Sequence, residues 1–60
     1  MTVTEARKLK KLKSIVYYGQ HEYLYVRAFR AIGVWYIVIA DKTTREEFTL
    51  LLSSVHVAAR

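Results

Sequence analysis

The segment Val34–Ala40, which reads VWYIVIA, limits the possible folds more than any other part of this sequence. Its residues are β-branched and aromatic, which is typical of a β-strand, and a strand with one wet face should alternate apolar and polar residues. This segment is apolar on both faces: one carries Trp35, Ile37 and Ile39, and the other carries Val34, Tyr36 and Val38. It therefore has to be covered on both faces, by the rest of the chain or by further copies of it.

The composition predicts one small folded domain, residues 1–60, without a cofactor. An apolar fraction of 53% argues against intrinsic disorder. The absence of Cys excludes disulfides and thiolate metal sites, and two His with five scattered acidic residues make a structural metal site a poor fit. Small domains without such crosslinks commonly depend on tight packing and self-association. We therefore expect a homo-oligomer.

The positive charge is concentrated at the start of the chain. Residues 1–13 contain five Lys and Arg against one acid, a net +4 of the total +5. Such a footprint is typical of contact with nucleic acid or an anionic membrane, and equally of a solvated helix face. The longest apolar run, 31–40, is ten residues, half of the roughly 20 that span a bilayer. With no signal-peptide core after the basic start, we expect a cytoplasmic protein without a membrane partner.

The order of expected elements is one helix followed by strands. Residues 1–13 predict a basic helix with Ala6, Leu9 and Leu12 on one side, and Thr2 or Thr4 can cap it. The expected strands are Ser14–Tyr18, Tyr23–Arg30 and Val34–Ala40, joined by turns. Within the second strand, alternation separates two sets of side chains: Leu24, Val26 and Ala28 on one face, and Tyr23, Tyr25, Arg27 and Phe29 on the other.

The tail after Arg45 fits two structures. As a helix, it carries an apolar stripe through Phe48, Leu52 and Val55, with capping boxes before it. As strands, Phe48, Leu50 and Leu52 alternate, and 55–57 form a short last strand after the Ser pair. The first reading gives an α-β-β-β-α sandwich, and the second gives a helix followed by five strands.

The second reading resembles the Sm-like small β-barrels. The WYL-domain family is similar in Ala6-Arg7-Lys8-Leu9, Ile15-Val16-Tyr17, Trp35-Tyr36-Ile37 to Asp41, and Arg45-Glu46-Glu47-Phe48. The RNA chaperone family Hfq is similar in length and in the closing segment 53–57. The resemblance covers residues 5–57 and implies a bent, five-stranded antiparallel Sm-like or SH3-like barrel over 14–60. It departs in Thr49-Leu50-Leu51-Leu52, where WYL domains carry basic ligand residues, and it lacks the Tyr-Lys-His signature of Hfq.

No pattern in the sequence predicts an enzyme or a metal site. The Ser, His and Asp residues are dispersed, and no paired carboxylates, nucleophile elbow or Gly-rich phosphate loop is present. His21 lies in an expected turn, and His56 lies between two valines where it would face outward. We therefore expect a non-catalytic protein.

Single-stranded nucleic acid, and RNA before DNA, is the partner that the sequence favours. Small barrels bind single strands with a cationic groove and aromatic rings on which bases stack. We expect base stacking on Tyr25 and Trp35, and phosphate contacts from six basic residues: Lys8, Lys10, Lys11, Lys13, Arg27 and Arg30. The alternative for each aromatic residue is a place in the core or in a subunit interface. The alternative function is a regulatory or inhibitory module that binds a protein through a sheet edge.

Overall fold

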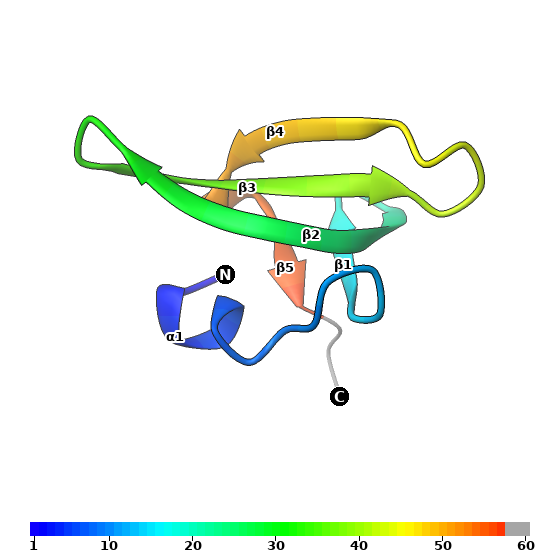
Figure 1. Cartoon of the computed structure of the whole chain (residues 1–60), viewed down its shortest axis with the longest axis horizontal. Coiled ribbons are helices and arrows are strands. Elements are labelled where there is room, and N and C mark those ends of the chain that lie inside the picture. The colour runs from blue at the N-terminus through cyan, green and yellow to red at the C-terminus, as the bar shows by residue number, and fades with distance from the viewer. Residues whose placement is uncertain (58–60) are drawn as a thin grey trace.

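The computed structural model describes residues 1–57, which form one antiparallel sheet and one short α-helix (Figure 1). The strand order is β4-β3-β2-β1-β5. The elements are α1 (Val3–Ala6), β1 (Ile15–Tyr18), β2 (His21–Ala31), β3 (Val34–Asp41), β4 (Glu47–Leu51), the 3-10 turn η1 (Leu52–Ser54) and β5 (His56–Val57). The mainly β prediction with five strands is confirmed. The α-β-β-β-α alternative is wrong, because residues 47–57 form strands and a 3-10 turn.

The N-terminal helix is much shorter than the sequence pattern predicts. It begins as expected, because the Thr2 hydroxyl accepts the Glu5 N–H at 3.2 Å and the Glu5 carboxylate accepts the Thr2 N–H at 2.9 Å. It then ends at Ala6, so the prediction of a basic helix through residue 13 is wrong. Residues 7–13, called the basic segment from here on, form turns instead.

A hydrogen bond to β2 holds residue 12 out of a helical conformation. The Leu12 N–H donates to the Tyr25 carbonyl at 2.6 Å, and Leu12 has a φ of 60°, which no right-handed helix contains. The Lys10 N–H donates to the Ser14 hydroxyl at 2.9 Å. A lone helix of about three turns is marginal in water, so bonds to the neighbouring strand outweigh the local helical preference.

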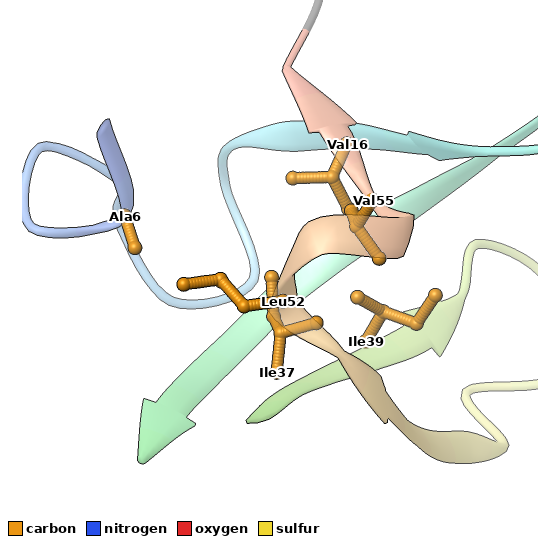
Figure 2. Packing of buried hydrophobic residues seen from close by; sticks show 6 residues of the cluster. All are labelled: Ala6, Val16, Ile37, Ile39, Leu52 and Val55. Carbon is orange, nitrogen blue, oxygen red and sulfur yellow. The ribbon is translucent and has the colours of Figure 1, made fainter. Parts of the chain in front are cut away.

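The main core lies on one face of the sheet, called the inner face, which carries Ile37 and Ile39 of β3. Both side chains have no exposed surface, and neither do Val16 of β1 and Val55 beside η1. Ala6 of α1 and Leu52 of η1 complete this cluster (Figure 2). The helix and the 3-10 turn therefore cover the inner face.

A β-bulge in β2 changes which side chains share a face. The register places Tyr25 opposite Ile39 but Arg27 opposite Val38, so one residue is extra between them. Paired residues lie on the same face of a sheet, so Tyr25 is on the inner face and Arg27 is on the outer face. The predicted placement of both on one face is wrong. Ala28, opposite Ile37, moves to the inner face by the same shift.

Half of β3 is covered on both faces by a single chain, which is what its two-sided apolar sequence requires. Residues 37–40 of β3 are all buried, with Val38 only 3% exposed on the outer face. Val26 and Phe29 of β2 pack around Val38 and Ala40 there. The other end of β3 is less covered, since Val34 is 40% exposed.

The connection from β4 to β5 shows that the sheet is strongly bent. These strands are the two edges, and the edges of a flat five-stranded sheet lie about 19 Å apart. Only residues 52–55 separate them, three of which form η1, and such a turn rises about 2 Å per residue. The edges must therefore curl toward each other. Among residues 1–57 the sheet nevertheless stays open, with no pairing between β4 and β5.

Candidate nucleic-acid interface

The two aromatic residues expected to stack bases line one hollow on the inner face. Tyr25 of β2 and Trp35 of β3 share this hollow, of about 230 Å³, with Arg7 at the C-terminal end of α1. Val3, Ala6 and Ala28 form the rest of its wall. We call it the inner hollow. Both aromatic side chains are half-buried, so each keeps part of its surface available for contact.

Backbone hydrogen bonds fix the basic segment beside Tyr25. The Tyr25 carbonyl accepts the Leu12 N–H, and the Tyr25 N–H donates to the Ser14 carbonyl at 3.0 Å. These bonds continue the β1–β2 pairing to residues that precede Ile15, the first residue of β1. The end of the basic segment therefore lies next to Tyr25 in space, although more than ten residues separate the two in the chain.

The predicted phosphate contacts from the N-terminal region are all exposed. They are Lys8, Lys10, Lys11 and Lys13, and they lie on the turns of the basic segment rather than on a helix. The one acid of the N-terminal region, Glu5, is occupied in the cap of α1. Within residues 1–57, none of these lysines lies within ion-pair distance of a carboxylate, since the ion pair found there joins Lys42 and Glu22.

The two predicted arginines of β2 lie on opposite faces of the sheet. Arg30 pairs with Trp35 in the register and is exposed, so it joins the inner-face group. Arg27 lies on the outer face with its guanidinium 4.8 Å from the centre of the Phe29 ring. The Phe29 ring stacks in turn on Tyr36 at 5.5 Å. The bulge therefore removes Arg27 from the predicted site.

Arg7 is the candidate contact that the sequence patterns missed. It is exposed and directly follows Ala6, the buried residue of α1. Its place in the basic run and next to Ala6 could have indicated it, because the residue after the last buried position of a short helix stays close to the surface that the helix covers.

Glu22 lies at the opposite end of the sheet, and its carboxylate accepts two hydrogen bonds. Lys42 Nζ donates to Glu22 at 2.8 Å, and the Tyr17 hydroxyl donates to the same carboxylate at 3.2 Å. The hydrogen bond from Lys42, followed by that from Tyr17, lowers the pKa of Glu22, and the Glu22 carboxylate raises the pKa of Lys42. Glu22 and Arg30 are eight residues apart in β2, or roughly 26 Å.

Asp41 completes the acidic end by organising the β3–β4 turn. Its carboxylate accepts the N–H groups of Thr43 at 2.7 Å and Thr44 at 2.9 Å. The Thr44 bond, followed by the Thr43 bond, lowers the pKa of Asp41. The sheet thus places Arg7 and Arg30 near the inner hollow, and the hydrogen-bonded carboxylates of Glu22 and Asp41 at the far turns.

A second hollow on the inner face is apolar. It measures about 150 Å³ and lies between Tyr18, Tyr23, Ile39, Phe48 and Leu50. The Tyr23 and Phe48 rings meet edge to face at 6.0 Å. This hollow contains no charged group, so it offers contact surface rather than chemistry.

Residues 1–57 contain no cluster of three or more His, Asp or Glu side chains arranged to hold a metal ion. The same part of the chain contains no helix with the length and apolar character needed to cross a bilayer. No protein-family model, curated protein or solved structure matches this chain. The candidate site is therefore defined by the geometry of its own residues, without support from a relative.

Proposed function

We propose that this chain is a non-catalytic protein that binds single-stranded RNA in the cytoplasm, with the inner hollow and the basic segment as its binding surface. The observation that carries the proposal is that Tyr25 and Trp35 line one hollow with Arg7. Aromatic faces contribute about 1–3 kcal/mol for each stacked base, and the contribution tolerates any sequence. Exposed lysines beside the rings would neutralise the phosphates of the same strand.

The bend of the sheet supports the proposal, because a barrel of the expected kind requires a bent sheet. The sheet is strongly bent, and a 3-10 turn leads from one edge strand to the other. We propose that the domain is an Sm-like or SH3-like barrel and that it self-associates through its sheet edges. Small barrels commonly bind a single strand of nucleic acid on a curved sheet of this kind.

Trp35 allows a direct test, because it is the single tryptophan of the chain. A ten-nucleotide single-stranded RNA should quench its fluorescence at about 50 mM salt. Raising the salt to about 200 mM should weaken binding by roughly a hundredfold if about five phosphates are neutralised. Micromolar RNA that leaves the fluorescence unchanged at the lower salt concentration would exclude the proposal.

The two arginines of β2 provide a matched pair of variants. Arg30→Glu should weaken RNA binding by at least tenfold, because it reverses a charge beside Trp35. Arg27→Glu makes the same change on the outer face and should have a much smaller effect. Equal losses in the two variants would show that the surface is not the inner hollow.

Protein binding through a sheet edge is the second candidate function, favoured by the exposed apolar residues Phe48 and Leu51 on the edge strand β4. Reversing the charges of Lys10, Lys11 and Lys13 separates the candidates. Loss of RNA with the oligomer intact supports the first function. Loss of a protein partner, with no RNA binding in the parent chain, supports the second.

A further inference from the structure

The edge strand β4 has an unpaired side along its whole length. It pairs with β3 on one side, and within residues 1–57 no other strand pairs with it. Figure 1 shows β4 as the outermost strand, with β3 on its inner side. A strand edge of this kind presents a row of unpaired backbone N–H and carbonyl groups, which is a template for another strand.

β4 has few of the features that usually protect a sheet edge, and its one charged residue is Glu47 at the start of the strand. The chain has no Pro, β4 has no Lys or Arg, and its register with β3 runs without a bulge. Phe48 is 39% exposed and Leu51 is 47% exposed, and their side chains, three positions apart, point to opposite faces. The other edge strand, β5, spans only His56–Val57. Strand pairing is therefore favoured at β4.

One hydrogen bond establishes which groups of β4 point outward. The Asp41 N–H donates to the Glu46 carbonyl at 2.9 Å. Hydrogen-bonded pairs alternate along an antiparallel ladder, so Phe48 and Leu50 direct their backbone groups to β3. The backbone groups of the other three residues of the strand then face the open edge: Glu47, Thr49 and Leu51.

We propose that β4 pairs antiparallel with β4 of a second copy of this chain, around a two-fold axis at Thr49. Thr49 then lies opposite Thr49 of the second copy, and Glu47 lies opposite Leu51 of the second copy. This is the one register in which all three outward-facing residues find partners within the strand. A shift by two residues would pair Leu51 with Arg45, which lies outside β4 and has a φ of 68°.

Side chains support the same register. Phe48 comes opposite Leu50 of the second copy, an aromatic–aliphatic contact that extends the apolar hollow across the interface. The two Glu47 carboxylates are not opposed, because four residues, or about 13 Å of strand, separate them. This proposal rests on the self-association in the proposed function and specifies its edge strand, β4, and its two-fold axis, at Thr49. It does not depend on RNA binding.

Engineered cysteines test the axis, because the chain has no cysteine of its own. Thr49 pairs with itself in the dimer, and the Cα atoms of such a pair lie about 5.5 Å apart, a separation that suits a disulfide. Thr49→Cys should therefore form a crosslinked dimer within minutes in a glutathione redox buffer. Glu47→Cys is the matched control and should stay uncrosslinked, whereas mixing it with Leu51→Cys should crosslink. Equal crosslinking of the two single variants would overturn the proposal.

The mass in solution provides the second test, without RNA. Sedimentation equilibrium should give twice the 7.0 kDa of one chain. Thr49→Lys should give the mass of one chain, because it places two ammonium groups opposite each other on an exposed position. Thr43→Lys adds the same charge in the β3–β4 turn and should remain dimeric.

Three mass results would overturn the dimer: a monomeric parent at all concentrations, a mass above two chains, or a Thr49→Lys variant that stays dimeric. Circular dichroism of Thr49→Lys shows whether the monomer is folded. A dimer without RNA binding would leave this interface standing and exclude only the RNA proposal.

Discussion

Ile32 occupies a conformation that its side chain disfavours. It has a φ of 51° and is followed by Gly33 with a φ of 74°, so the two-residue turn between β2 and β3 needs two left-handed residues. Glycine and asparagine adopt this region readily, whereas a β-branched residue does not. Ile32 is also 99% exposed, so no packing compensates for its conformation.

Replacing Ile32 with a turn-forming residue should stabilise the protein. We expect Ile32→Asn to raise the free energy of unfolding by about 1 kcal/mol, because the left-handed cost for an ordinary residue is roughly 1–2 kcal/mol. The midpoint of urea denaturation measures the change. Ile32→Val keeps the branched side chain and should leave the midpoint unchanged. An unchanged midpoint in Ile32→Asn would show that the turn is not strained in solution.

The residues of the candidate site differ in how well the sequence indicates them. Tyr25 and Trp35 were predicted from aromatic character and strand position, and they do line one hollow. Arg27 was predicted by simple alternation and lies on the other face, because the bulge after Tyr25 shifts the register. No glycine marks the bulge, since Gly19 and Gly33 are both turn residues. Strand alternation therefore identifies the rings but not the cations around them.

The strands and the turns between them are the elements that the sequence predicts correctly, because they depend on residues close together in the chain. Gly19 and Gly33, with positive φ, occupy the turns that flank β2, and β-branched and aromatic residues fill the strands. The prediction of a helix through residue 13 was wrong. Leu12 donates a hydrogen bond to Tyr25, a contact between distant parts of the sequence that no local pattern indicates. The tail fits both patterns in sequence, and the burial of Leu52 and Val55 around η1 favours the strands.

The β3–β4 turn should make the stability of the protein depend on acidic pH. The pKa of Asp41 is lowered in the folded state by the Thr44 and Thr43 N–H groups. Its contribution to stability is complete above the pKa of the unfolded chain, near 4, and is lost as the pH falls through the lower folded value. Glu22 behaves in the same way, whereas the raised pKa of Lys42 affects stability only at alkaline pH.

We expect Asp41→Asn to reduce the loss of stability on acidification. Between pH 7 and pH 3, the urea midpoint of this variant should fall less than that of the parent chain. The variant should also be less stable at pH 7, because an amide oxygen is a weaker acceptor than a carboxylate. Glu47→Gln is the control, since Glu47 accepts no side-chain hydrogen bond in the part of the chain that the structure describes. A pH dependence that Asp41→Asn leaves intact would assign the effect to Glu22.

For the whole molecule, the margin of stability is small. A chain of 60 residues has a free energy of unfolding of about 3–9 kcal/mol at typical values per residue. Its inner-face core has six fully or nearly fully buried residues, and no disulfide supplements it. Leu52 is central to this core because η1 holds the two edges of the bent sheet near each other.

Truncating Leu52 should therefore remove a large part of this stability. Leu52 is 4% exposed, and Leu→Ala in a core costs about 2–5 kcal/mol, which approaches the whole margin. The midpoint of urea denaturation, followed by circular dichroism, measures the loss. Leu12→Ala, at a site that is 43% exposed, should lower the midpoint much less. A Leu52→Ala midpoint equal to that of the parent chain would mean that the 3-10 turn does not hold the bent sheet.

Pairing through β4 should make thermal stability depend on protein concentration. When two folded chains dissociate on unfolding, mass action stabilises each chain by about 0.7 kcal/mol for every tenfold rise in concentration. For a domain of this size, that corresponds to a rise in Tm of roughly 3–6 °C. Thr49→Lys, which blocks pairing at the axis, should have a lower Tm that does not vary with concentration. The Thr43→Lys control should follow the parent chain, and a parent Tm that is constant over two decades of concentration would contradict the dimer even if crosslinks form.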